Sequence, residues 1–153
     1  AGTATLVQPL THAGISALEG PNPHFREGER IEVQVAQLDT LAEFQEHLAE
    51  IDKQVGLIKI DIEGFEGRLV DDLNTLLDHH RPKVLLELHW DEIVERHGHS
   101  RRDIMMAFLS RGYRCGRLQW HQKMPKAGFM QETTLENLDE MLATKNHAMY
   151  ALF

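Results

Sequence analysis

The sequence predicts an α/β fold built on a mixed sheet, and three observations carry that prediction. Residues 57–63 and 84–89 are apolar runs of strand length, and each ends in acidic or imidazole side chains. Between them, apolar side chains recur at helical spacing over residues 65–80. A strand, an amphipathic helix and a second strand within about thirty residues indicate a right-handed parallel crossover. We therefore expect these two strands to be adjacent and parallel in the centre of the sheet.

The N-terminal third of the chain adds two strands and a helix to the predicted fold. Residues 3–10 and 31–37 alternate between apolar and polar side chains, as half-buried strands do. Residues 40–51 carry apolar side chains at helical spacing, and we expect Asp39 or Thr40 to cap that helix. These three elements precede the central crossover in chain order.

Five further elements are expected after the second central strand. In chain order they are a short helix over 91–96, a helix opened by a capping box at 100–103 and ended by Gly112, a strand over 113–120, a helix capped by 133–136 and continuing to Leu142, and a final strand over 148–153. A chain of 153 residues has room for one core, so we expect a single domain.

Charged side chains gather at the ends of the two central strands. Alternation places Lys59, Asp61 and Glu63 on one face of the first strand, and Glu87 and His89 share a face at the end of the second. In open α/β sheets, ligands bind outside the carboxyl ends of the parallel strands. We therefore expect these side chains to converge at one edge of the sheet and to serve a site.

Taken without further information, the same residues also have purely structural interpretations. Lys59 and Asp61 would form an ion pair, and Glu63 would cap the following helix through its backbone N–H groups. The pairs at 79–80 and 97–99 place histidines in polar, turn-like surroundings, where a solvated imidazole is the default. On the residues alone, we favour the structural interpretation of the acidic strand end.

Three segments of the chain resemble the FkbM-type methyltransferases. They are Gln-Leu-Asp-Thr-Leu over 37–41, Gly-Leu-Ile-Lys-Ile-Asp-Ile-Glu-Gly-Phe-Glu over 56–66, and Arg-Pro-Lys-Val-Leu-Leu-Glu-Leu-His over 81–89. The family pattern has a Leu-Asp-x-Leu helix start, a Lys-Ile-Asp-Val-Glu-Gly-x-Glu strand and a strand that ends in Glu-x-His. The opening residues and 14–18 also resemble the hairpin and Ser-Leu segment that precede this pattern, and the resemblance fades after about Gly112.

The resemblance implies the C-terminal portion of a Rossmann-like class I methyltransferase sheet, in which the last strand runs antiparallel to its neighbours. It also implies S-adenosylmethionine as cofactor, which such enzymes hold at a glycine-rich turn after the first strand. No Gly-x-Gly-x-x-Gly cluster follows a predicted strand here, and the sequence does not begin with Met. We therefore expect the chain to be the C-terminal part of a longer domain and to lack the cofactor-binding half.

By the same resemblance, Asp61, Glu63 and His89 are the expected catalytic residues on the methyl-acceptor side. A carboxylate there would accept the proton of an attacking hydroxyl, which we expect to belong to a sugar or another small metabolite. His89 would act as a base or orient the acceptor. A divalent metal held by the carboxylates and His89 is a further possibility, although no tight ligand motif such as His-x-x-x-His is present.

Three further residues are expected to help bind the substrate. Glu87 would hold the tautomer of His89, and Trp90, which follows His89 directly, would wall an acceptor pocket. Ser16 is expected to contact the substrate on the strength of the resemblance alone. The expected partner is therefore a small-molecule acceptor.

Composition restricts the remaining function classes. A net charge of −8 argues against nucleic acid or an anionic membrane as the main partner, and no run approaches the roughly 20 apolar residues of a membrane span. The single Cys115 cannot form an internal disulfide, which either favours a reducing, cytoplasmic compartment or carries no information. An exposed sheet edge would promote self-association. The alternatives to a methyltransferase are a non-catalytic α/β fragment or binding module, and a metal-dependent hydrolase that uses the same acidic strand ends.

Overall fold

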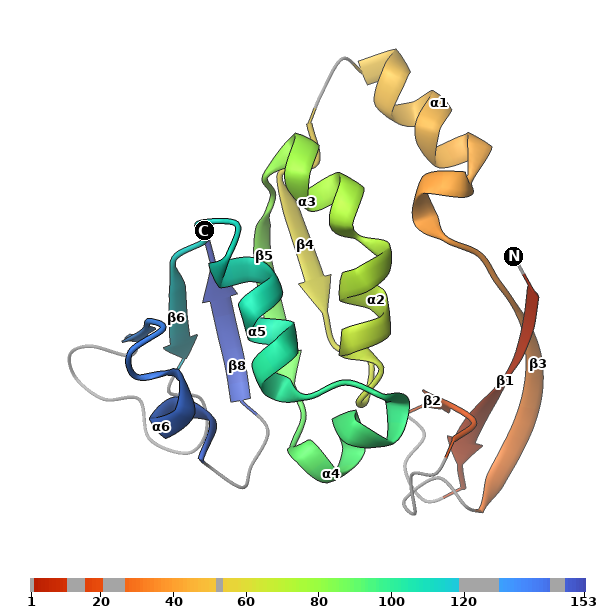
Figure 1. Cartoon of the computed structure of the whole chain (residues 1–153). Coiled ribbons are helices and arrows are strands. Elements are labelled where there is room, and N and C mark those ends of the chain that lie inside the picture. The colour runs from red at the N-terminus through yellow and green to blue at the C-terminus, as the bar shows by residue number, and fades with distance from the viewer. Residues whose placement is uncertain (1, 11–15, 21–26, 52–53, 119–129, 144–147) are drawn as a thin grey trace. The chain divides into compact units, whose positions relative to one another are not determined.

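The computed structural model divides the chain into two compact units, residues 1–53 and 54–153 (Figure 1). The structure describes residues 2–10, 16–20, 27–51, 54–118, 130–143 and 148–153. No helix within these ranges is long and apolar enough to cross a membrane.

The first unit contains a small antiparallel sheet in the order β2-β1-β3. Its strands are β1 (Gly2–Pro9), β2 (Ala17–Leu18) and β3 (Gly28–Val35). β1 and β3 pair along their whole lengths, from Gly2 opposite Val35 to Pro9 opposite Gly28. Both strands predicted for this region are therefore confirmed, each displaced by a few residues at its ends.

The helix of the first unit begins later than predicted. A 3-10 turn, η2 (Leu38–Thr40), precedes α1 (Ala42–Ile51). α1 begins at Ala42, so the residue before it is Leu41, and the Thr40 hydroxyl donates to the Gln37 carbonyl at 2.7 Å; the predicted cap at Asp39 or Thr40 is therefore wrong. The physical reason is that Thr40 lies inside the 3-10 turn, whereas a capping residue needs an extended backbone.

The second unit contains a mixed sheet in the order β4-β5-β8-β6-β7. Its strands are β4 (Leu57–Ile60), β5 (Lys83–Leu88), β6 (Cys115–Leu118), β7 (Met130–Thr133) and β8 (Ala148–Leu152). β4 and β5 are parallel neighbours, and β8 runs antiparallel to β5, which confirms both predictions. The predicted central position is wrong for β4, which forms one edge of the sheet among the described strands.

The connection between β4 and β5 is helical, as predicted, but it consists of two helices. They are α2 (Glu66–Asp72) and α3 (Asn74–His80), separated by Leu73, whose ψ is near zero. Aspartates precede Leu73 and Asn74 follows it, and these residues favour a helix less than Ala or Leu does. Val70 of α2 and Leu77 of α3 are nonetheless buried, so each helix contributes to the core.

The second central strand leads into α4 (Asp91–Val94), η3 (Glu95–His97) and α5 (Arg101–Leu109). In Figure 1, α2, α3 and α5 lie on the same side of the sheet. The predicted cap at Ser100 is confirmed, because the Asp103 N–H donates to Ser100 Oγ at 3.0 Å. This cap fixes the start of α5. It therefore also fixes the end of the segment between β5 and α5.

The last part of the chain departs from the prediction in one respect. α6 (Leu138–Leu142) starts after the predicted cap at 133–136, and Thr133 belongs to β7. Asn137 forms a local turn there: its Oδ1 accepts from the Thr134 N–H at 2.7 Å and its Nδ2 donates to the Glu132 carbonyl at 3.0 Å. Part of the strand predicted over 113–120 is observed as β6, and residues 119–120 lie outside the described ranges.

Cys115 lies in the core of the second unit. Its neighbours across the sheet are Thr133 on β7 and Leu152 on β8. Burial raises the pKa of the Cys115 thiol to about 12. The thiol is therefore almost wholly protonated at neutral pH and behaves as a small apolar side chain.

Candidate functional site

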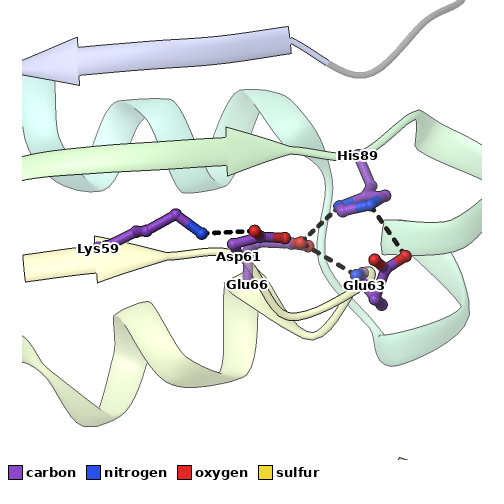
Figure 2. Close-up of polar contacts among 6 residues, drawn as sticks. Lys59, Asp61, Glu63, Glu66 and His89 are labelled. Carbon is purple, nitrogen blue, oxygen red and sulfur yellow. Dashed lines mark hydrogen bonds and ion pairs between the residues drawn. The ribbon is translucent and has the colours of Figure 1, made fainter. Parts of the chain in front are cut away.

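Five ionisable side chains meet at the carboxyl ends of β4 and β5, and we call them the strand-end cluster (Figure 2). The members are Lys59, Asp61, Glu63, Glu66 and His89. They come from β4, the turn that follows it, the first residue of α2 and the residue after β5. Sequence reasoning placed Asp61, Glu63 and His89 together at this edge but did not assign a site role to Glu66.

The turn after β4 sets the direction of the Glu63 side chain. β4 ends at Ile60, so the strand predicted to reach Glu63 is too long. The Phe65 N–H donates to the Ile62 carbonyl at 3.3 Å, and Glu63 and Gly64 both have positive φ, 56° and 103°. Positive φ at both central residues is the feature of a type I′ turn. Glu63 therefore does not continue the alternation of the strand, and the turn directs its side chain instead.

Gly64 is required in this turn for two reasons. Its φ of 103° lies in the left-handed region that side chains rarely adopt. In addition, a Cβ at Gly64 would overlap the Ile93 side chain of α4. α4 therefore packs directly on the turn and fixes its position.

Glu66 is the most buried member of the strand-end cluster. Its side chain has no exposed surface, and its Oε1 accepts the Gly64 N–H at 2.9 Å. The same oxygen lies 2.7 Å from Nδ1 of His89. Glu66 Oε2 is buried and has no hydrogen-bond partner among the described residues. All the hydrogen bonding described for this carboxylate is therefore concentrated on one oxygen.

His89 lies between two carboxylates. It is 4% exposed, and its Nε2 is 3.3 Å from Oε2 of Glu63. Burial by itself lowers the pKa of His89, but the hydrogen bond and charge of Glu66, with the charges of Glu63 and Glu87, outweigh it and raise the pKa. The surroundings therefore favour the imidazolium form, in which both ring nitrogens donate.

Lys59 and Asp61 form the exposed part of the cluster. Lys59 Nζ is 2.5 Å from Asp61 Oδ2, and the two side chains are 55% and 32% exposed. The hydrogen bond to Asp61 outweighs partial desolvation and raises the pKa of Lys59. The ion pair expected from the structural interpretation is therefore present, and Asp61 remains accessible to a ligand from solvent.

Glu87 acts on both parts of the cluster. This half-buried residue of β5 contributes to the raised pKa of Lys59 and to that of His89 through its charge. Nδ1 of His89 lies 2.7 Å from Glu66 Oε1, so Glu66 holds the tautomer of His89, a role that was expected of Glu87. Glu87 thus contributes negative charge to the cluster.

The two other predicted substrate contacts differ in their surroundings. The Trp90 ring lies 5.9 Å from the His89 ring at an interplanar angle of 50°, and the residue is half-buried. This position suits a wall beside the cluster. Ser16 is half-buried next to β2 in the first unit, so its predicted contact with substrate stays a prediction.

Two further histidines pack against the start of α2 instead of being fully solvated as expected. The His97 ring meets the Phe65 ring edge-on at 5.1 Å, and burial lowers the pKa of His97. His99 occupies the space where a Cβ of Gly67 would lie, and its Nε2 is 3.6 Å from Asp71 Oδ2. The segment after β5 is therefore attached to α2 through imidazole rings.

The described residues bear on two cofactors, a divalent metal and S-adenosylmethionine. No group of three or more His, Cys, Asp or Glu side chains in the described ranges is arranged to hold a metal ion. A glycine turn that holds a nucleotide-like cofactor must leave open space for the ligand. The space in front of Gly64 is filled by Ile93, so this turn does not fit S-adenosylmethionine.

Sequence reasoning missed Glu66 although a signal was present. Glu66 occupies the last position of the Glu-Gly-x-Glu pattern in the family resemblance, three residues after Glu63. It is also the first residue of a helix, where an acidic side chain is common and is normally exposed. That ordinary interpretation concealed the fact that the side chain turns inward towards His89.

Comparison with known proteins gives one match. The family model of the FkbM methyltransferase domain matches residues 3–115, a range that includes the whole strand-end cluster. No curated protein and no solved structure matches the chain. Since the match spans well over half of its length, the chain belongs to the FkbM methyltransferase domain family, and this membership points to methyltransferase activity.

Proposed function

We propose that the strand-end cluster forms the acceptor side of a methyltransferase that methylates a hydroxyl group of a sugar or another small metabolite. The observation that carries this proposal is the meeting of carboxylates and an imidazole at the carboxyl ends of two parallel strands, in a chain of the FkbM family. Such strand ends are where open α/β sheets bind their ligands. The parallel pair followed by the antiparallel β8 is compatible with a Rossmann-like methyltransferase sheet.

A hydroxyl is a weak nucleophile, so it needs a group that accepts its proton as the oxygen forms a bond to the methyl carbon. Asp61 is our choice for this group, because its carboxylate is accessible while Lys59 Nζ holds one of its oxygens at 2.5 Å. S-adenosylmethionine, which the family implies, would supply the methyl group: its sulfonium–methyl bond would break as the oxygen–carbon bond forms, and S-adenosylhomocysteine would leave. The proton that the hydroxyl loses would pass to the Asp61 carboxylate.

Glu63 and His89 have a supporting role in this proposal. Glu63 is 29% exposed and is held by His89 Nε2, so its carboxylate offers an acceptor of fixed position to a second hydroxyl of the substrate. A sugar presents neighbouring hydroxyl groups, and two fixed carboxylates would orient it with one hydroxyl towards Asp61. Trp90, beside His89, would cover one side of the bound sugar.

The proposal assigns residues on the acceptor side only. Gly64 is packed against Ile93, so the turn after β4 offers no open cradle for the cofactor. The residues that contact S-adenosylmethionine are therefore not assigned, and no step of the proposal depends on them.

The test is methyl transfer from radiolabelled S-adenosylmethionine to a panel of hydroxylated small molecules, measured for the parent and for Asp61→Asn. The substitution keeps the size and hydrogen-bonding capacity of the side chain but removes its charge. We expect the turnover to fall by about 10² or more if Asp61 accepts the proton. An unchanged turnover would show that the exposed part of the cluster is structural.

Asp78→Asn is the matched control. Asp78 is likewise an exposed aspartate in an ion pair, with Arg111 Nε at 2.7 Å from its Oδ1, but it lies on α3. We expect the turnover of this variant to equal that of the parent. A similar fall in both variants would indicate a general effect of removing an ion pair.

A further inference from the structure

Glu66 is the member of the strand-end cluster that a substrate does not reach. Its side chain is fully buried, and one of its oxygens binds both the Gly64 N–H and the Nδ1 side of His89. The carboxylate therefore ties the turn after β4 to the residue after β5. A group in this position acts on a reaction through its neighbours.

The first of these neighbours is His89. An ionised Glu66 only accepts hydrogen bonds, so Nδ1 of His89 must carry a proton. If the ring were neutral, the lone pair of Nε2 would face Glu63 Oε2 at 3.3 Å, and this contact would be repulsive. With a proton on each nitrogen, the ring donates to both carboxylates. The geometry is therefore satisfied by the imidazolium.

The second neighbour is Glu63. Its φ of 56° is uncommon for a residue other than glycine, and such conformations are strained unless their surroundings support them. The Nε2 proton of His89 supplies support at the tip of the side chain. Glu66 thus reaches the partly exposed Glu63 carboxylate through the imidazole ring.

We propose that Glu66 is a positioning residue of the methyl-transfer reaction: it keeps both ring nitrogens of His89 donating, and His89 in turn holds the Glu63 carboxylate beside the acceptor. This inference rests on the proposed function. The charged groups that act on His89 are Glu66 of α2, Glu63 of the turn and Glu87 of β5. His97 of η3 also interacts with the charge of Glu66.

The test is nitrogen-15 NMR of the imidazole rings in the full chain, followed over a pH titration. In the parent protein we expect both nitrogens of His89 to be protonated at pH 6.5, and its titration midpoint to lie above the ordinary value for histidine. Glu66→Gln keeps an oxygen that can accept the same two donors but removes the charge. In that variant we expect the midpoint to fall by at least about one pH unit and the neutral ring to keep its proton on Nδ1.

Asp71→Asn is the control for this measurement, because Asp71 of the same helix pairs with a different imidazole, His99, at 3.6 Å. It should leave the titration of His89 unchanged. Should the buried amide of Glu66→Gln prevent folding, Glu63→Gln provides a second variant, for which we expect a smaller fall of the His89 midpoint. A parent ring with Nε2 unprotonated at pH 6.5, or equal midpoints in parent and variants, would overturn the inference.

Activity gives the second readout and separates the two proposals. Glu66→Gln should lower kcat by about tenfold or more, leave KM for S-adenosylmethionine unchanged, and have no further effect in a His89→Gln background, because both act on Glu63. If His89 titrates as expected but the protein methylates no hydroxyl, the proposed function fails and the role of Glu66 in it fails too. If methylation occurs while His89 titrates as an ordinary histidine, only the role of Glu66 fails.

Discussion

The strand-end cluster has an exposed part and a buried part that use the same chemistry under different conditions. Lys59 and Asp61 pair at 2.5 Å in solvent, whereas Glu66 and His89 pair at 2.7 Å with almost no exposed surface. Water screens the first pair, so breaking it costs the fold little. Removing one member of the second pair leaves a buried donor or charge without a partner. The comparison indicates that the exposed pair can serve the reaction, while the buried pair maintains the geometry.

The largest expected effect tests this comparison directly. Glu66→Ala leaves the Gly64 N–H and the Nδ1 side of His89 without their acceptor, and we expect a loss of about 3–5 kcal/mol in the free energy of unfolding. Asp61→Ala should leave the free energy of unfolding close to that of the parent. Urea unfolding followed by circular dichroism measures both values. Equal losses in the two variants would contradict the division into an exposed and a buried part.

An intermediate effect is expected at the turn that joins the two parts. Gly64→Ala must adopt a φ of 103° and also displace Ile93, so we expect a loss of about 2–4 kcal/mol in the free energy of unfolding. Gly98→Ala is the matched control, because Gly98 has a φ of 83° and nothing within 4 Å of its Cβ position. It should lose only about 1–2 kcal/mol. The difference between the two losses measures how tightly α4 holds the turn.

The smallest expected effect is a dependence of the free energy of unfolding on pH. This free energy should rise with pH below the ordinary pKa of histidine and fall with pH above it. The pKa of His89 is raised, so its contribution is complete below about pH 6.5 and is lost as the pH rises through the folded-state value. The pKa of His97 is lowered, so its contribution is present above about pH 6.5 and is lost as the pH falls. Stability should therefore be greatest near pH 6.5.

Two variants separate these contributions in thermal unfolding measured between pH 5 and pH 8. His89→Gln should abolish the decline above the maximum, and His97→Gln should abolish the decline below it. A parent protein whose stability rises steadily from pH 6.5 to pH 8 would contradict the assignment of His89.

The sequence predicted the features that depend on local spacing. Two apolar runs of strand length joined by an amphipathic helix identified β4 and β5 as a parallel pair, and the spacing from Ser100 to Asp103 identified the start of α5. Glu63 and His89 were expected at one edge because parallel strands end on the same side of a sheet, and they do meet there. These inferences need only the order of residues along the chain.

The missed features depend on conformations and contacts that spacing does not encode. Period-two alternation does not show that β4 stops at Ile60, and a positive φ at Glu63 is improbable for any residue with a side chain. The inward position of Glu66 depends on His89, which follows a different strand 23 residues later. The break at Leu73 reflects a balance of weak helix propensities that packing decides.

The burial of Cys115 has a practical consequence for all of these measurements. A thiol with a pKa of about 12 and no exposure hardly reacts with an alkylating reagent while the sheet is closed. The same thiol becomes accessible and far more acidic once β7 and β8 separate from β6, and it is the only cysteine in the chain. When the reagent is concentrated enough to react faster than the sheet recloses, the rate of Cys115 alkylation equals the opening rate of this part of the sheet and so reports how long the folded state persists.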